Sequence, residues 1–163
     1  MKKISIALII ALITICSSCA GYKPIFNESN LNFEIINYSL QGETEIAKSI
    51  YYKLDNLSKN KNNKLEGRKI NLIIEVLKKK QALSKDGTGQ VLEYNMTLKT
   101  KVLVKDSLTN TEILNYQAGS SVAYSVQERY SDTLKFENNS INNLIDSIYQ
   151  EFLIKLTDSI KSK

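Results

Sequence analysis

The sequence has no histidine among its 163 residues. This absence excludes catalysis by a Ser-His pair, by an imidazole acid or base, or at a His-ligated metal, so an enzyme built on this chain would depend on carboxylates alone. The spacing of the Asp and Glu residues indicates no catalytic pair, and no segment has the pattern of a metal site or a phosphate-binding loop. We therefore expect no enzymatic activity, no metal and no cofactor.

Cysteine is also scarce, because the chain has only Cys16 and Cys19. Residues 1–3 are Met-Lys-Lys, and residues 4–15 are almost entirely apolar. That apolar stretch is too short to cross a bilayer as a helix, which takes about 20 residues, and is typical of a secretory signal. Two serines followed by Cys19 resemble the lipobox of bacterial lipoproteins. We predict that a signal peptide over residues 1–18 is removed and that Cys19 carries lipid.

The lipidation site leaves two alternatives, an ordinary secreted protein with an unmodified Cys19 or a retained signal anchor. The sequence departs from the usual lipobox at Cys16, where Leu is common. If Cys19 is lipidated, the mature chain has no thiol for a disulfide or a metal site. Its acyl chains anchor it firmly, because each buried methylene contributes about 0.8 kcal/mol. Ala20, rather than Asp, comes next; by analogy with the sorting rule of enteric lipoproteins, this favours the outer membrane, on its periplasmic side.

The charge balance does not indicate a nucleic-acid partner. Removing residues 1–18 leaves 145 residues, enough for one domain. Two of the 22 basic residues are lost against 17 acidic ones, so the mature chain has a net charge of +3. This mild positive charge suits an anionic lipid, although from charge alone a solvated surface is the simpler explanation.

Hydrophobic periodicity predicts the elements of the first half. Residues 19–32 contain the only proline and are expected to form a lipidated tether, and a short strand begins at Phe33. From Gln41 to about Lys59 apolar residues recur at helical spacing. A polar loop over 58–67 precedes a strand from Arg68 to about Leu83, which alternates between two faces. Its far end is basic, with Lys78, Lys79 and Lys80.

The second half is predicted to contain two strands and a helix. An Asp-Gly turn within residues 85–89 indicates a hairpin that leads into a long alternating strand, Gln90–Asp106. A turn precedes another strand from Leu114 to Tyr124. Residues 125–140 are polar and irregular. Ser140 fits the N-cap of a last amphipathic helix that ends near Ile160, and we expect its apolar stripe to pack on the sheet rather than on a membrane or a partner helix.

The order of elements is therefore β-α-β-β-β-α. Each helix has one apolar face, and the consecutive strands share another. The simplest arrangement is an α+β fold, a two-layer sandwich with both helices on one face of a mostly antiparallel four-stranded sheet. We expect a single domain over residues 33–160.

Three stretches, together with this order, resemble the LptE family of lipopolysaccharide-assembly lipoproteins. They are Cys-Ala-Gly-Tyr-Lys-Pro-Ile-Phe at 19–26, the basic turn and Gln-x-x-Glu-Tyr hairpin within 82–98, and the apolar helix over 143–156. Two features depart from the commoner pattern, the additional Cys16 and two extra residues in the turn between Lys85 and Gln90.

The resemblance implies a non-enzymatic role at the outer membrane. Members of the family form a one-to-one complex with the β-barrel protein LptD, help it to fold, partly plug its lumen and bind lipopolysaccharide. Lys85 and Lys135 match places where the family tends to carry a basic residue near its lipopolysaccharide-binding edge, and Arg129 lies close to the second in sequence. Lys78–Lys80 are weaker candidates, and Tyr94 and Tyr124 are expected to pack rather than to contact ligand.

Three other functions are alternatives to this one. An auxiliary lipoprotein of an ABC-type lipid transporter would have a similar tether and size. An envelope glycan hydrolase would need two carboxylates about 5–10 Å apart, which the sequence does not indicate. A purely structural lipoprotein is the third alternative.

Overall fold

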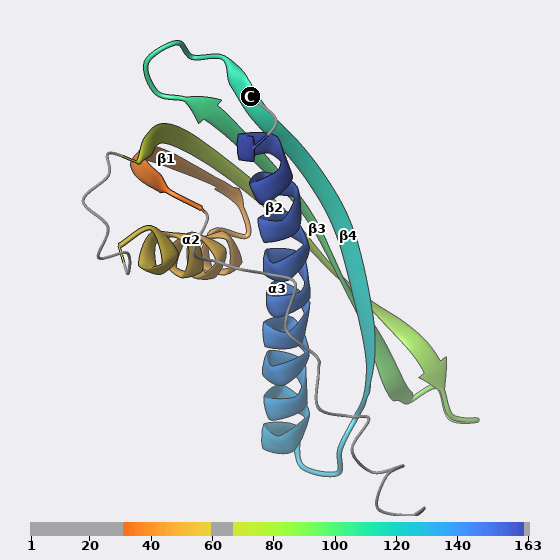
Figure 1. Ribbon diagram of the computed structural model, residues 1–163. Helices are drawn as coiled ribbons and strands as arrows, with labels where there is room; N and C mark the ends of the chain where they lie inside the picture. Colours follow the sequence, from red (N-terminus) through yellow and green to blue (C-terminus); the bar gives the residue numbers. More distant parts are fainter. Residues whose placement is uncertain (1–30, 60–66, 162–163) are drawn as a thin grey trace, which may run out of the picture.

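The computed structural model describes residues 31–59 and 67–161 and has the expected order β-α-β-β-β-α (Figure 1). The elements are β1 (Phe33–Gly42), α2 (Thr44–Lys59), β2 (Arg68–Lys85), β3 (Val91–Asp106), β4 (Glu112–Ser125) and α3 (Tyr130–Lys161). The predicted signal peptide, the predicted lipidation site Cys19, and most of the predicted tether and of the 58–67 loop lie outside the described residues.

The four strands form one sheet in the order β1-β2-β3-β4. β1 runs parallel to β2, and α2 forms the crossover that a parallel pair requires; the β2–β3 and β3–β4 pairs are antiparallel hairpins. Both helices lie on the same face of the sheet, α2 against β1 and β2 and α3 mainly against β4 (Figure 1). The predicted α+β two-layer sandwich with a mostly antiparallel sheet is therefore confirmed.

The core lies between the two layers and follows the alternation predicted from the sequence. Each fully buried aliphatic side chain contributes about 1.5–3 kcal/mol, so this core is the main source of stability. β2 and β3 supply Ile70, Leu72, Ile74, Val76, Met96, Leu98, Val102 and Val104. The helices supply Ile46, Ala47, Ile50, Leu54, Leu144, Ile145, Ile148, Phe152, Leu153 and Leu156. None of the described helices is long and apolar enough to cross a membrane.

The last helix begins ten residues earlier than predicted. α3 starts at Tyr130, and Ser140, the predicted N-cap, lies inside it with only 7% of its surface exposed. The carbonyl of Arg129 accepts bonds from the amides of Asp132 and Thr133 and starts the helix. The prediction was wrong because residues 130–140 lack an apolar stripe: this part of α3 lies beyond the apolar core.

The first helix begins later than predicted, because β1 continues through Gly42. Its last residues remain paired with β2, with Gly42 opposite Val76. Gly42 has φ of 73°, which directs the chain out of the sheet, and the Glu43 amide then donates to the Val76 carbonyl at 2.8 Å. The Glu43 carbonyl accepts the first amide bonds of α2, from Ile46 and Ala47.

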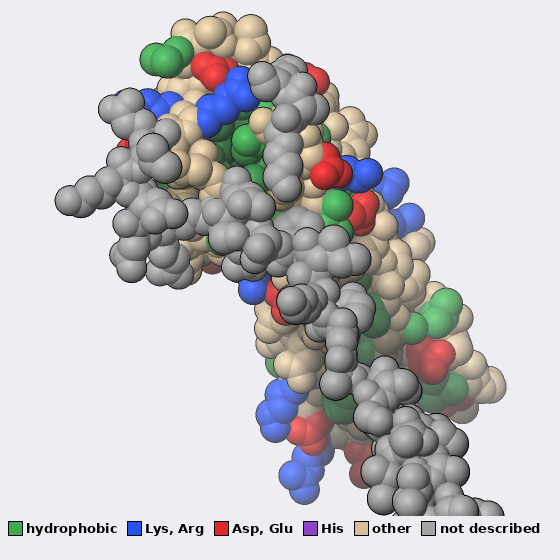
Figure 2. All heavy atoms as spheres, viewed as in Figure 1, with side chains coloured by type: hydrophobic (Ala, Val, Ile, Leu, Met, Phe, Trp, Pro, Cys, Tyr) green, Lys and Arg blue, Asp and Glu red, His purple; other side chains and the backbone are tan. Residues whose placement is uncertain are grey.

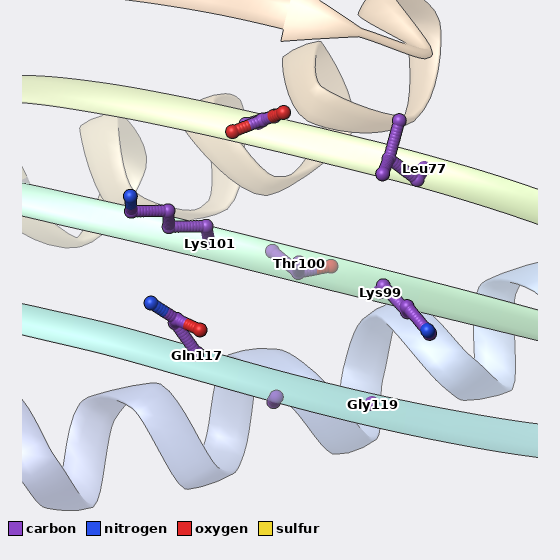
Figure 3. A pocket seen from close by; sticks show the side chains of 8 residues that line it. Leu77, Lys99, Thr100, Lys101, Gln117 and Gly119 are labelled. Carbon is purple, nitrogen blue, oxygen red and sulfur yellow. The ribbon is translucent and has the colours of Figure 1, made fainter.

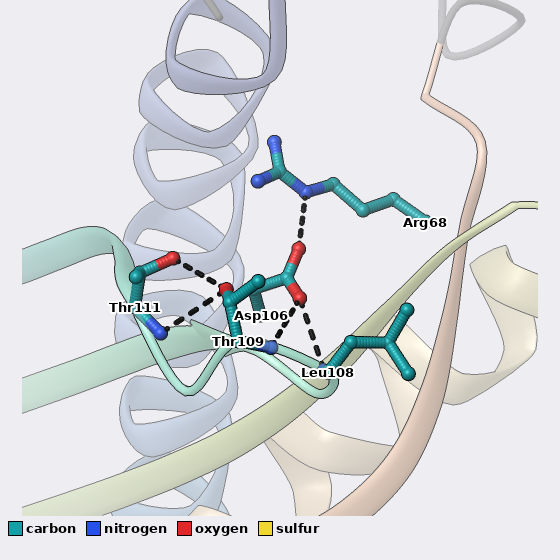
Figure 4. A network of polar contacts seen from close by, with 5 residues as sticks. All are labelled: Arg68, Asp106, Leu108, Thr109 and Thr111. Carbon is teal, nitrogen blue, oxygen red and sulfur yellow. Dashed lines mark hydrogen bonds and ion pairs between the residues drawn. The ribbon is translucent and has the colours of Figure 1, made fainter.

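Asp106 organises the β3–β4 turn (Figure 4). One of its carboxylate oxygens accepts bonds from the amides of Leu108 and Thr109, at 3.0 and 3.1 Å. The other accepts Nε of Arg68 at 3.0 Å, which ties the turn to the first residue of β2. Hydrogen bonds from the backbone amide of Thr109 and from the guanidinium of Arg68 lower the pKa of Asp106, so the carboxylate stays charged at neutral pH.

We predict that Gly42→Ala destabilises the fold by at least about 2 kcal/mol. A Cβ on Gly42 would lie 2.1 Å from the Val76 carbonyl oxygen, and the positive φ adds roughly 1–3 kcal/mol of backbone strain. Gly87→Ala is the matched control, because a Cβ there meets no atom within 4 Å. Urea unfolding of both variants measures the difference, and equal stabilities would contradict this account of the β1–α2 junction.

Candidate functional site

The candidate site lies at the end of the sheet where the β2–β3 hairpin meets the start of α3. We call this region the hairpin end and define it as residues 80–94 of the hairpin together with residues 124–137 (Figure 1). It contains all three basic residues that the sequence predicted for lipid binding. It also carries the part of the sheet that extends past the apolar core.

A pocket of about 330 Å³ lies between the hairpin and α3. Its walls combine apolar and polar side chains from both chain segments. They are Lys80, Gln90, Val91, Tyr94, Val126, Gln127, Glu128, Tyr130, Thr133, Leu134 and Glu137. Thr133 holds the wall in place, because its buried hydroxyl accepts the Gln127 amide at 2.8 Å.

Lys80 is the cation that lines this pocket. Its Nζ lies 2.5 Å from Oε2 of Glu137, and the same oxygen accepts the Tyr124 hydroxyl at 2.9 Å. The ammonium also lies 4.3 Å from the centre of the Tyr94 ring and 5.6 Å from that of Tyr124, distances at which a cation and an aromatic face attract. One charge thus joins β2, β3, β4 and α3.

The electrostatics of this cluster keep both charges. Burial by itself lowers the pKa of Lys80, but its hydrogen bonds with Glu137 and Tyr124 outweigh burial and raise the pKa above the ordinary range. For Glu137, burial favours the neutral acid, but the hydrogen bonds from Lys80 and Tyr124 outweigh burial and lower the pKa below 4.5. Burial is also the main reason why the pKa of Tyr124 is raised. The cluster is therefore a stable ion pair at neutral pH.

The hairpin turn presents Lys85 to solvent. Lys85 is the last residue of β2 and pairs with Val91, which lines the pocket. Asp86 fixes the turn: its Oδ1 accepts the Thr88 hydroxyl at 2.7 Å and the amides of Thr88 and Gln90 at 2.9 Å. The Thr88 hydroxyl and the Gln90 amide lower the pKa of Asp86. Lys85 therefore projects from a turn of defined shape.

Arg129 and Lys135 lie on the other side of the pocket, at the start of α3. Arg129 is exposed between two residues that line the pocket, Glu128 and Tyr130. Lys135 is also exposed and forms an ion pair of 3.1 Å with Asp132, one turn earlier. The three predicted residues thus flank the same pocket from two segments, but none of them lines it.

Exposed apolar side chains accompany these cations. Leu83 and Leu92 on the hairpin are 56% and 48% exposed, and Tyr130 and Phe136 on α3 are 75% and 49% exposed. Figure 2 shows Lys and Arg side chains beside the start of α3 and hydrophobic side chains on the hairpin. Apolar surface next to cations suits a ligand that is itself amphiphilic, with an anionic group beside hydrocarbon.

The sequence did not assign Glu137 to the site, and it indicated Lys80 only as one of three weaker candidates. The alternation of β2 could have indicated Lys80. It lies on the same face of the strand as the buried residues Ile70, Leu72, Ile74 and Val76. A lysine on that face needs an acidic partner from the helical layer. Tyr94 and Tyr124 do pack against each other and the core, as predicted, with ring centres 5.9 Å apart.

The groups at the site are suited to binding a ligand. Among residues 31–59 and 67–161, no group of three or more His, Cys, Asp or Glu residues is arranged to hold a metal ion. The carboxylate of Glu137 is already engaged by Lys80 and Tyr124. What the site offers a ligand is cationic side chains, aromatic faces and apolar surface.

The fold is shared with bacterial lipoproteins of known structure. A protein assigned as a lipoprotein from Caulobacter crescentus has a TM-score of 0.60, with 12% identity over 83% of this chain and 95% of its own. Lipoprotein B from Nitrosomonas europaea has a TM-score of 0.55, with 16% identity over 85% and 93%. A minor lipoprotein from Acinetobacter baumannii has a TM-score of 0.53, with 14% identity over 79% and 92%.

These similarities show a common fold only. Sequence identities this low do not indicate a common function. No protein-family model matches the sequence, and no curated protein matches it.

We predict that Glu137→Gln lowers the free energy of unfolding by about 1–2 kcal/mol at pH 7, a value reduced because the Lys80 side chain is 35% exposed. Because the folded-state pKa of Glu137 is lowered, the carboxylate stabilises the fold above pH 4.5 and loses that contribution as the pH falls through the folded pKa. The deficit of the variant should therefore be smaller at pH 3 than at pH 7.

Urea unfolding at the two pH values measures this effect. Glu128→Gln is the matched control, since Glu128 lines the same pocket but forms no ion pair with another described residue. We expect that control to stay within about 0.5 kcal/mol of the parent. A deficit for Glu137→Gln that is the same at both pH values would show that the loss comes from packing and not from the charge.

Proposed function

We propose that this chain is an outer-membrane lipoprotein of the LptE type, which forms a complex with an LptD-type β-barrel, helps the barrel to assemble, plugs it and binds lipopolysaccharide. The observation that carries the proposal is the hairpin end, where Lys85, Arg129 and Lys135 surround a pocket that has exposed apolar side chains beside it. The fold of bacterial lipoproteins and the predicted lipid on Cys19 support it.

The chemistry of lipopolysaccharide matches this surface. Its lipid A part carries phosphates, which Lys and Arg bind by charge-assisted hydrogen bonds. Its acyl chains need apolar contacts, which Leu83 and Leu92 on the hairpin and Phe136 on α3 offer. In this function the protein changes no covalent bond, so it needs no histidine as an acid, base or metal ligand.

A role as a plug places a different demand on the molecule. A protein inside a barrel needs a rigid core and a polar outside that can form hydrogen bonds with the lumen. The face of the sheet opposite the helices presents such groups, including Asn95, Lys99, Lys101 and Gln117, all on β3 and β4. Thr97 and Ser121 form a hydrogen bond of 2.8 Å across the same face.

We predict that the tagged, lipidated protein, extracted from membranes in detergent, brings down a large outer-membrane β-barrel in near-equal amount. Mass spectrometry of the captured proteins measures the ratio. Capture of an inner-membrane ATPase complex would support the alternative function, an auxiliary lipoprotein of an ABC-type lipid transporter. Capture of neither would leave a purely structural role and would contradict the proposal.

We predict that Lys85→Glu combined with Lys135→Glu weakens lipopolysaccharide binding roughly tenfold, because two exposed cation–phosphate contacts of up to about 1 kcal/mol each become repulsive. Adding Arg129→Glu should weaken binding further. All three side chains are exposed, so thermal unfolding should change little.

The control is Lys155→Glu, which makes the same charge change at an exposed position near the other end of α3. Binding of labelled lipopolysaccharide to each variant is compared in the same detergent. Equal affinity of the double variant and the parent would remove Lys85 and Lys135 from the site.

A further inference from the structure

In the described part of the chain, the outer edge of β4 from Ile113 to Ser125 has no partner strand. β4 pairs only with β3 among the described elements, so its other side carries a row of backbone groups available for hydrogen bonding (Figure 1). From Ile113 to Ser125 the strand has no charged residue and no proline. Its register with β3 has no bulge between Leu114 and Ser125. Natural edge strands usually carry one of these features, because each prevents pairing with another chain.

The opposite edge of the same sheet is protected. β1 has ten residues against 14 in β4, and it carries a charged residue, Glu34. Its pairing with β2 is interrupted by a register shift between Ile35 and Asn37. A bulge of this kind twists an edge away from a straight partner strand. β4 carries its one charged residue, Glu112, and its register shift at the start of the strand, so the edge from Leu114 to Ser125 has neither feature.

A hollow of about 440 Å³ lies on the face of the sheet opposite the helices, next to this edge (Figure 3). Gly119 forms its floor on β4, because it has no side chain, and a Cβ built there would meet no atom within 4 Å. Lys99 on β3 pairs directly with Gly119, and Lys101 pairs with Gln117. Leu77 of β2 lies on the far side of the hollow and is 55% exposed.

The hollow is positively charged on the side nearest β4. Neither Lys99 nor Lys101 forms an ion pair with any residue in the described part of the chain. Glu75 also lines the hollow and pairs with Lys101 in register, but it lies two strands from β4, and no salt bridge joins the two. A ligand that approaches from the β4 side therefore meets Lys99 across Gly119, whereas Gln117 lies between the edge and Lys101.

We propose that β4 accepts an extended segment of a partner protein as a fifth strand, with an acidic side chain of that segment placed in the hollow over Gly119. Neighbouring strands lie about 4.8 Å apart, so a residue paired with Gly119 is separated from Lys99 by bare backbone only. Main-chain hydrogen bonds supply the affinity, and the hollow selects the side chain, as in other complexes formed by strand addition.

Charge favours such a partner over a second copy of this chain. Two β4 strands paired with each other would bring no acidic side chain to either hollow, since β4 has none after Glu112. They would also place the Lys99 and Lys101 pairs of both copies on one continuous sheet. The hollow shares no lining residue with the pocket at the hairpin end, so this inference stands whether or not the hairpin end binds lipid.

The experiment uses the mature, lipidated protein in detergent and blocked peptides of about nine residues, a usual strand length. The peptides alternate Thr and Val and carry Glu, Gln or Lys at the centre. We expect the Glu peptide to bind about three- to tenfold more tightly than the Lys peptide, as cross-strand charge pairs would give. Hydrogen exchange should show protection of amides within 113–125 on binding.

Two variants test the hollow. Gly119→Thr should fold normally, since its side chain enters open space, and should bring the Glu and Lys peptides to nearly equal affinity. Lys99→Glu should reverse the preference. Asn115→Thr, exposed on the same face of β4 and paired with Leu103, is the matched control and should leave the preference unchanged.

Three results would overturn the proposal. The first is no binding of any peptide, with β4 amides that stay unprotected. The second is binding without preference between Glu and Lys that neither variant alters. The third is protection of the β4 amides from hydrogen exchange before any peptide is added. That would show that a second copy or another segment of this chain already occupies the edge. Sedimentation distinguishes the two cases, because only a second copy makes a dimer.

Discussion

The ion pair between Lys80 and Glu137 allows the sheet and α3 to extend beyond the apolar core. β2 has 18 residues and β3 has 16, but the row of buried aliphatic side chains on β2 ends at Val76. Past that point the helix-facing row of β2 continues as Lys78 and Lys80. A lysine placed between a sheet and a helix destabilises their packing unless a carboxylate pairs with its ammonium group. Glu137 does so, and Tyr94 and Tyr124 shield the pair from water.

Where apolar periodicity continues, the sequence was sufficient to predict the structure. The strands over 68–85 and 91–106 and the helix around Ile148 and Phe152 were predicted within a few residues, because burial of one face fixes both register and orientation. The order of elements and the two-layer arrangement followed from the same pattern. The parallel pairing of β1 with β2 follows from the helix between them.

The sequence failed where polar contacts replace apolar ones. The first three turns of α3 were predicted to be irregular because Glu137 and Thr133 form no apolar stripe, and their partners, Lys80 and Gln127, lie outside the helix. The candidate site shows the same limit. Lys85 and Lys135 were identified by resemblance and Arg129 by its position near Lys135, whereas the pocket between them is formed only where the hairpin and α3 meet in the fold. No local pattern encodes a pocket formed by segments about 40 residues apart.

The two proposed binding surfaces of the molecule are separated by the geometry of β3. Tyr94 points to the helix face and contributes to the hairpin end, whereas Lys99 points to the opposite face (Figure 3). Five residues along the strand correspond to about 17 Å, farther than the distance over which side chains without shared partners usually influence one another. A strand bound at the edge of β4 would therefore leave the pocket at the hairpin end unobstructed. A protein that is held by one partner while it binds a lipid needs this separation, because the holding contact must not compete with the ligand.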